Sequence, residues 1–177
     1  MAGDSKPAFH FRRATQADAE AICAVMAAAV GSLGDPMSYL VDDLAFVSEH
    51  IARRGFTLVS TEDGQVVGFQ IVRFPRTDPD NLGRDIGLSG SELDQVAHLE
   101  SAAVVPAHWG EGLGRELLVR AQEELSGQGF RYLMCTVYPA NPASLHNLEA
   151  AGYRVVATKS KYGGYTRHVM LKEHPRP

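Results

Sequence analysis

Three glycines within five residues mark the part of the chain where residue type and spacing most clearly suggest chemistry. The segment WGEGLG, residues 109–114, lies between a strand-like run that ends near Val105 and a run with helical spacing. Glycine has no Cβ to keep an anion away from the backbone, and a helix N-terminus offers free N–H groups and partial positive charge. The segment therefore predicts a turn that binds phosphate groups. A glycine-rich connection without a ligand is the alternative.

Spacing separates the cofactors that such a turn can bind. A P-loop requires Lys and then Ser or Thr after the last glycine, whereas this chain has Arg115 and Glu116. A dinucleotide-binding fold requires G-x-G-x-x-G near the first strand of a βαβ unit. Here the third glycine comes one residue early and the turn lies past the middle of the chain. The spacing therefore excludes both nucleotide interpretations.

The segment VVPAHWGEGLGRELL, residues 104–118, resembles the acetyl-CoA-binding segment of the GNAT superfamily of N-acetyltransferases. The signature of that segment is Arg or Gln, two residues, Gly, one residue, and then Gly or Ala. Gly112 and Gly114 match it, and Trp109 stands where Arg or Gln is usual. Because the diphosphate contacts in this family come mostly from backbone amides, the resemblance implies a CoA-binding turn in spite of Trp109.

A second segment, NPASLHNLEAAGY at residues 141–153, resembles a later motif of the same family. Asn141 and Ser144 match, as does the closing Gly-Tyr pair, and Leu148 takes the place where many members have a tyrosine. The residues alone indicate that Asn141 caps a helix and that Ser144 is a first-turn helix residue, with or without a ligand. The family adds a hydrogen bond from Asn141 to the pantetheine arm of CoA.

The two motifs together imply acetyl-CoA as the acyl donor and no metal. The residues implied to bind it are Val104, Val105, Trp109, Gly110, Gly112, Leu113, Gly114, Arg115, Asn141 and Ser144. The acyl group would pass directly to an amine in a ternary complex, so the amine must lose a proton and the thioester oxygen needs a hydrogen-bond donor. In this family that donor is typically a backbone amide on the strand before the turn, here near Val104.

The candidate general base lies on the strand HLESAAVV, which precedes the turn. Because side chains alternate along a strand, one face is expected to carry His98, Glu100, Ala102 and Val104. An unpaired carboxylate is costly to bury, so Glu100 is expected in a wet cleft, with a pKa raised toward the range of a base. The alternative is a structural carboxylate paired with Arg73. His98 is the second candidate base, against a satisfied core or surface histidine.

The general acid and the acceptor site stay open. Leu148 replaces the tyrosine that often protonates the departing thiolate, which leaves Tyr138, Ser144, Tyr162 or water. The family places the acceptor pocket against segments that are here residues 31–50, 74–93 and 161–168. An acidic group in the first of these could attract a cationic amine or could form a solvated helix face: Asp42, Asp43 and Glu49.

The function predicted from these motifs is transfer of an acetyl group to a primary amine of a small molecule or peptide. A non-catalytic module that senses CoA or acyl-CoA is the alternative, because both motifs contain a substitution. An enzyme that uses a longer acyl-CoA or a hydroxyl acceptor is a third interpretation. The prediction also allows a homodimer.

The elements that must position these residues follow from periodicity and capping signals. Strands are expected at 9–13, 56–61, 65–72, 96–105, 131–138, 153–158 and 166–172. Helices are expected from Thr15 to Val30, from Asp35-Pro36 to Gly55, from the glycine turn to Leu125, and from Asn141-Pro142 to Gly152. Residues 74–93 are expected to form a functional or mobile loop. The predicted fold is α/β, GNAT-like, with a single mixed, mostly antiparallel sheet of about seven strands and about four helices.

The bulk properties fit one globular domain. Its predicted extent is residues 9–173, between a flexible N-terminus, residues 1–8, and a tail, residues 174–177. The net charge of −4 does not suggest a nucleic-acid partner or an anionic membrane. No apolar run reaches the roughly 18 residues of a membrane span, so a cytoplasmic location is expected. Cys23 and Cys135 are expected to be buried free thiols.

Overall fold

The computed structural model describes residues 8–175. Most of the expected N-terminal extension, residues 1–7, and the end of the expected tail, residues 176 and 177, lie outside the described residues. No helix in the described range is both long and apolar enough to cross a membrane.

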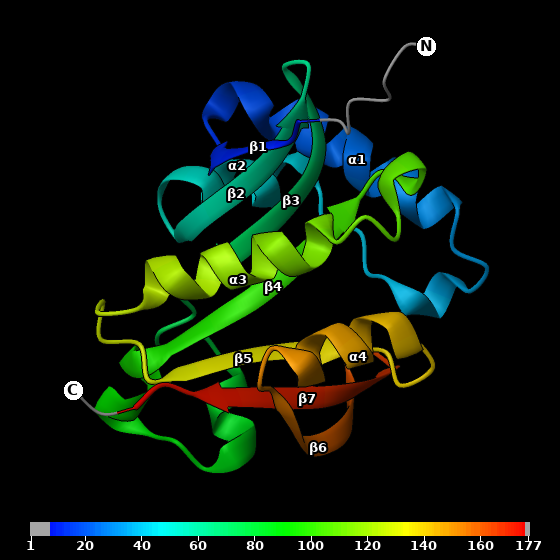
Figure 1. Ribbon diagram of the computed structural model, residues 1–177. Helices are drawn as coiled ribbons and strands as arrows, with labels where there is room; N and C mark the ends of the chain where they lie inside the picture. The colour runs from blue at the N-terminus through cyan, green and yellow to red at the C-terminus, as the bar shows by residue number, and fades with distance from the viewer. Residues whose placement is uncertain (1–7, 176–177) are drawn as a thin grey trace, which may run out of the picture.

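One mixed sheet runs through residues 8–175 (Figure 1). Its seven strands lie in the order β1-β2-β3-β4-β5-β7-β6, and only β4 and β5 pair in parallel. The strands are β1 (His10–Arg13), β2 (Gly55–Glu62), β3 (Gln65–Arg73), β4 (Val96–Val104), β5 (Tyr132–Val137), β6 (Arg154–Lys161) and β7 (Tyr165–Glu173). The predicted fold class, a single mixed and mostly antiparallel sheet, is confirmed.

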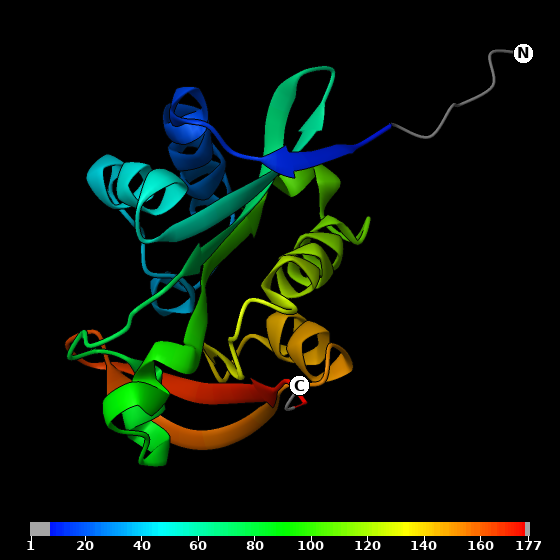
Figure 2. The ribbon, with the colours of Figure 1, turned by 90° about the vertical axis from the view of Figure 1, so that its left-hand side faces the viewer.

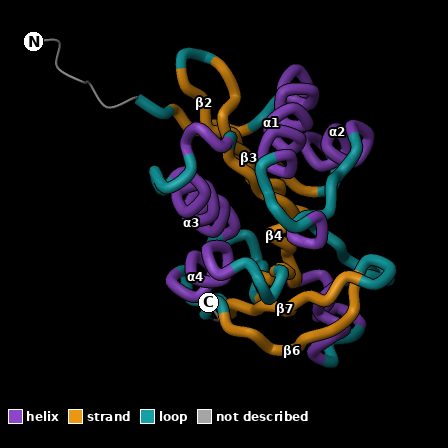
Figure 3. The backbone as a smooth tube through the Cα atoms, turned by 90° about the vertical axis from the view of Figure 1, so that its right-hand side faces the viewer, coloured by secondary structure: helices purple, strands orange, loops and turns teal. Residues whose placement is uncertain are grey.

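Four α-helices of the described chain cover the two faces of this sheet. On one face lie α1 (Ala19–Gly31) and α2 (Leu44–Ala52), and on the other lie α3 (Leu113–Leu125) and α4 (Pro142–Ala150), as Figure 2 and Figure 3 show. We call these the α1/α2 face and the α3/α4 face. α3 is amphipathic, and its residues Leu117, Ala121 and Leu125 are fully buried at helical spacing.

The predicted start of the second helix was wrong. Asp35 and Pro36 open only a short 3-10 helix, η2 (Pro36–Ser38), in which the Asp35 carboxylate accepts from the Met37 N–H. The α-helix begins at Leu44, where Asp43 is the N-cap and accepts from the Phe46 N–H at 2.8 Å. The connection between η2 and α2 carries Tyr39 and Asp42, and the Tyr39 hydroxyl contacts that of Ser101 on β4.

The long segment between β3 and β4 is ordered by buried polar contacts. It forms two 3-10 helices, η3 (Leu82–Ile86) and η4 (Gly90–Gln95). Arg73 binds Asp80 at 2.8 Å and Asp78 at 2.6 Å, and the buried side chain of Asn81 accepts from the Gly83 N–H at 2.9 Å. η3 extends the covering of the α1/α2 face over β5 and β7, so the main role of this segment is structural.

β4 and β5 separate soon after they meet. Only Val96–His98 of β4 pair with β5, where their partners are Tyr132–Met134. Figure 1 shows the two strands diverging beyond these residues. On its other edge β4 has a β-bulge: Ile71 pairs with Ser101 and Val72 pairs with Leu99, so Glu100 is the extra residue. A bulge re-aims the side chains around it. It lies at the point where the sheet opens.

Candidate active site

A cavity of about 730 Å³ fills the space between the diverging halves of β4 and β5. Its walls include both strands, the glycine turn before α3, the start of α4 and the connection between α1 and α2. That volume lies in the range of sites for small organic ligands. Because the sheet is open here, the cavity reaches from the α3/α4 face to the α1/α2 face.

Side chains of β4 divide between the two ends of the cavity. Leu99 and Val104 belong to the α3/α4 face: Leu99 packs in the core beneath α3, and Val104 Cγ2 would lie 3.9 Å from a Cβ at Gly114. Ser101 points to the α1/α2 face, where its hydroxyl contacts that of Tyr39. The predicted single face for His98, Glu100, Ala102 and Val104 is therefore wrong, because the bulge at Glu100 shifts the alternation by one residue.

The glycine turn has the features of an anion site. Gly110 and Gly112 have φ of 84° and 85°, and a Cβ on either would meet nothing within 4 Å, so the space in front of the backbone is open. Gly112 is the N-cap of α3 and supplies no side chain to cap it. The N–H groups of Leu113, Gly114 and Arg115 in the first turn therefore have no helical acceptor and remain for a ligand. All of these residues line the cavity.

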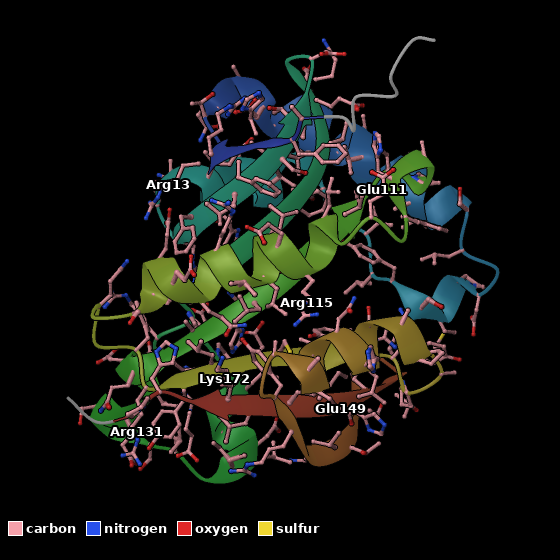
Figure 4. The ribbon with its side chains drawn as sticks, viewed as in Figure 1. Arg13, Glu111, Arg115, Arg131, Glu149 and Lys172 are labelled. Carbon is pink, nitrogen blue, oxygen red and sulfur yellow. The ribbon has the colours of Figure 1, made fainter. Side chains whose placement is uncertain are left out.

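Trp109 ties this turn to β4. Its indole Nε1 donates to the Val104 carbonyl at 2.7 Å, while 47% of the residue stays exposed. It therefore does not cap the core but forms part of the cavity wall. Figure 4 shows Arg115 on the side of α3 that faces α4, where its exposed guanidinium lies close to the cavity. A cation there suits a phosphate group.

The edge of β4 that faces the cavity carries free backbone groups. In an antiparallel pair, alternate residues direct their N–H and C=O groups to the partner strand. The Val105 N–H donates to Val67 O at 2.9 Å, so Ala103 also faces β3, and the backbone groups of Ala102 and Val104 face the cavity. The Val104 carbonyl accepts from Trp109, which leaves the Val104 N–H free. Val105 does not line the cavity, and its carbonyl accepts from the His108 N–H. The prediction that Val105 binds acetyl-CoA is therefore not supported, because Val105 lies outside the cavity lining and its N–H and C=O both have partners within the protein.

Asn141 and Ser144 lie at the start of α4, on the cavity wall. Asn141 Oδ1 accepts from the Ser144 N–H at 3.1 Å, which is the helix cap that the sequence predicts. This contact uses the side-chain oxygen and leaves the amide NH₂ of Asn141 as a donor. Leu148 lines the cavity as well, in the place where the family has a tyrosine.

Glu100 lies in the cavity wall, where its carboxylate contacts one histidine and one arginine. Its carboxylate is 3.1 Å from His98 Nδ1 and 3.6 Å from Arg73. Burial would raise the pKa of Glu100, but the hydrogen bond with His98 and the charge of Arg73 outweigh it, so the pKa lies below its ordinary value. The expected upward shift is wrong for this reason. The ion pair with Arg73, which the sequence offered as the alternative, is present.

His98 is a buried residue with both ring nitrogens occupied. The Leu82 N–H donates to Nε2 at 3.0 Å, and because a backbone N–H can only donate, the ring proton is on Nδ1. Nδ1 then donates to Glu100 at 3.1 Å. His98 is 3% exposed and is not part of the cavity wall, so it is positioned to orient Glu100.

Asp42 is a second carboxylate in the cavity, on the α1/α2 side. Burial raises the pKa of Asp42 to about 6, and the negative charge of Glu100 contributes in the same direction. The sequence predicted for Asp42 only that it could attract a cationic amine together with Asp43 and Glu49. No periodic signal separates it from its neighbour Asp43, which is exposed, because the extended connection after η2 decides which of them faces the cavity.

Two tyrosines reach the same end of the cavity. The Tyr162 hydroxyl lies 3.0 Å from Thr136 Oγ1, and withdrawal of the phenol end from water raises the pKa of Tyr162 to about 12. The Tyr138 hydroxyl donates a hydrogen bond to the Asp35 carboxylate at 2.7 Å, and this hydrogen bond raises the pKa of Tyr138. The expected buried thiols are free cysteines: Cys135 is buried in the cavity wall, and Cys23 is partly buried.

Comparison with known proteins agrees with this geometry. The model of the acetyltransferase (GNAT) family matches residues 26–153. A putative acetyltransferase, yncA of Salmonella typhimurium, solved with its cofactor acetyl-CoA, is 25% identical, with 94% of each chain covered and a TM-score of 0.69. A search of curated proteins gave no match.

Two further solved structures share the fold. A ribosomal-protein-alanine N-acetyltransferase from Brucella melitensis is 23% identical, with 93% of this chain and 99% of that chain covered and a TM-score of 0.69. A GCN5-related N-acetyltransferase from Kribbella flavida is 24% identical, with 94% and 98% covered and a TM-score of 0.69. Because the family model matches residues 26–153, more than half of the chain, the chain belongs to the GNAT acetyltransferase family and is an acyl-CoA-dependent N-acyltransferase.

Proposed function

We propose that this enzyme transfers the acetyl group of acetyl-CoA to a primary amine of a small molecule or peptide. The observation that carries the proposal is a cavity that begins at the uncapped N-terminus of α3 and ends at Glu100 on the other face of the sheet. The diphosphate of CoA would bind the N–H groups of the first turn of α3. The pantetheine would follow the open edge of β4, which directs the thioester into the opening beside Glu100.

The reaction is direct transfer in a ternary complex. The amine nitrogen forms a bond to the carbonyl carbon, and the carbon–sulfur bond breaks. The backbone N–H of Val104, on the open edge of β4, is the proposed donor to the carbonyl oxygen as negative charge develops there. Holding both reactants in one cavity supplies part of the rate enhancement.

Glu100 is the proposed acceptor of the proton that the amine loses. A carboxylate with a lowered pKa stays ionised at neutral pH, so it attracts an ammonium group and can take its proton once the nitrogen begins to bond. Asp42 is a second candidate base, because a pKa of about 6 is better matched to proton transfer near neutral pH. His98 keeps Glu100 in place in either case.

Tyr162 is the proposed donor to the departing thiolate. Its hydroxyl keeps its proton at neutral pH because its pKa is about 12, and Thr136 Oγ1 can accept or donate beside it. Tyr138 is less suited, because its hydroxyl already donates a hydrogen bond to the carboxylate of Asp35. A CoA thiol leaves readily near neutral pH, so this donor would assist the reaction without being essential.

The test is thiol release from acetyl-CoA with a panel of amines. We expect release that depends on the amine, and a loss of about 10²- to 10⁴-fold in Glu100→Gln, the range for a general base. A similar loss of thiol release in Asp42→Asn, in place of Glu100→Gln, would identify Asp42 as the general base. Glu124→Gln is the matched control, because Glu124 pairs with Arg13 away from the cavity. Thiol release unaffected by Glu100→Gln would contradict the assigned role.

The same panel separates the remaining alternatives. Tight CoA binding without thiol release for any amine would instead indicate a sensor, which the family membership disfavours. Release only with longer acyl-CoA donors, or with hydroxyl acceptors, would correct the donor or the acceptor class. We also propose a cytoplasmic location for the enzyme, where acetyl-CoA is available to it.

A further inference from the structure

Arg167 on β7 is a buried cation that forms no ion pair with a carboxylate in the described part of the chain, and the charge of Asp35 interacts with it without forming an ion pair. The residue is 4% exposed, lines the cavity and forms no ion pair with any of residues 8–175. It donates to the Met37 carbonyl at 2.7 Å and to the Thr166 carbonyl at 3.0 Å. A guanidinium has five N–H donors, so three are left. A buried charge in this state is expensive unless an anion completes it.

The position of Arg167 separates it from the CoA phosphates. Along β7, Met170 packs beneath α3 and α4, whereas Val169 belongs to the cluster on the opposite side, so Arg167 shares the face of Val169. Its bond to Met37 carries it toward η2, on the α1/α2 side. The glycine turn opens on the α3/α4 side. Arg167 therefore faces the acceptor end of the cavity.

The acceptor end also carries negative charge. Glu100, Asp42 and Tyr162 line the same cavity as Arg167. Charges of both signs act on the Tyr162 hydroxyl there, because Glu100 raises its pKa and Arg167 lowers it. A ligand that fits this pattern has an ammonium group for the carboxylates and an anionic group for the guanidinium. A plain amine would satisfy only half of it.

We propose that Arg167 binds a carboxylate or a similar oxyanion of the acceptor, so that the substrate is a small amphoteric molecule of the amino-acid type. The proposal rests on the proposed acetyl transfer and names its substrate class. The oxyanion accepts N–H groups of Arg167, and this holds the amine of the same molecule toward Glu100. A neutral amide in place of the acid would leave the guanidinium without its counter-charge.

A purely structural role for Arg167 makes a different prediction. In that role the guanidinium connects β7 to η2 through Met37 and packs on the rings of Tyr138 and Tyr165, whose centroids are 5.4 and 5.2 Å away. Removing it would then lower activity equally for acidic and neutral acceptors. The ratio of the two activities, measured on one preparation, does not depend on how much of the variant is folded.

The experiment compares free amino acids with the matching amino-acid carboxamides. The two readouts are kcat/KM for thiol release from acetyl-CoA and calorimetric binding to the CoA-loaded protein. We expect the wild type to prefer the acid by roughly 10-fold or more, since a single charge-assisted hydrogen bond corresponds to at least that ratio. Arg167→Gln should bring the ratio close to one. Arg131→Gln should leave it unchanged, because Arg131, labelled in Figure 4, pairs with Glu173 at the end of β7, whereas Arg167 lies near its start.

Each outcome decides for or against the anion site. Two outcomes overturn the proposal while acetyl transfer stands. One is thiol release that is equal or faster with carboxamides than with acids. The other is a ratio of acid to carboxamide activity that Arg167→Gln leaves unchanged. Acids that bind in an Arg167-dependent way without thiol release support the anion site and contradict the acetyltransferase function. If no acid in the panel is either bound or turned over, the proposal is overturned.

Discussion

His98→Leu is expected to change the pH dependence of catalysis, although His98 is proposed to touch neither substrate. Leucine fills a similar volume but removes the acceptor of the Leu82 N–H and the donor to Glu100. The hydrogen bond from His98 is the largest of the contributions that lower the pKa of Glu100. Without it, burial dominates and the pKa of Glu100 rises. The acid limb of kcat/KM should therefore move to higher pH.

The stability change follows from the same two hydrogen bonds. A buried N–H without an acceptor costs about 1–3 kcal/mol, and removing a hydrogen bond to a charged group costs about 1.5–3 kcal/mol. Allowing for overlap, His98→Leu should lower the free energy of unfolding by about 2–5 kcal/mol. For a chain of this length that corresponds to roughly 5–15 °C in Tm. Thermal unfolding measures it independently of activity.

Asn81→Leu is the matched control for this prediction. It also leaves one buried backbone N–H of η3 without an acceptor, that of Gly83, and it removes the donor to the Arg76 and Leu93 carbonyls, but it does not touch Glu100. Asn81→Leu should lose at least as much stability as His98→Leu, and only His98→Leu should shift the acid limb of the profile, measured with one acceptor from pH 5 to 8. A His98→Leu enzyme with a lowered Tm but the wild-type pH profile would refute the proposed link between His98 and Glu100.

Four further substitutions have distinct expected results. Gly112→Ala and Gly127→Ala, with φ of 85° and 78° and open space at both, should each lose about 1–2 kcal/mol by thermal unfolding, but only Gly112→Ala should weaken CoA binding in a titration. Trp109→Phe removes the bond to Val104 and should cost about 1 kcal/mol and raise KM for acetyl-CoA; an unchanged KM would show that this tether does not position the turn. Asp42 ionises only near pH 6 when folded but near pH 4 when unfolded, so the protein loses stability as pH rises between these values. Asp42→Asn should therefore raise Tm at pH 8 and leave it unchanged at pH 4, and the opposite pattern would contradict the raised pKa.

Local signals predicted the elements that carry the proposed CoA site. Three glycines before an amphipathic run specify the turn and α3, and Asn141-Pro142 specifies the cap of α4. These features depend on residues close in sequence, so the sequence alone contains them. The start of α2 was missed because Asp35-Pro36 and Asp43 are both good helix starts, and only packing selects the second.

The acceptor side depends on contacts between distant residues. The bulge at Glu100 contains no glycine that would reveal it, and it arises from the register between β3 and β4. This one residue decides that Glu100 faces His98 and Arg73 while Val104 faces α3. Arg167 gave no signal either, because an arginine on a strand is usually exposed and its burial depends on η2.

The most direct test of the proposed mechanism is a structure of the enzyme with acetyl-CoA. We predict that the diphosphate contacts the N–H groups of the first turn of α3, that the pantetheine amides pair with Ala102 and Val104, and that the acetyl group lies in the opening of the sheet facing Glu100. A diphosphate bound elsewhere, or a thioester held on the α3/α4 face out of reach of Glu100, would contradict the mechanism.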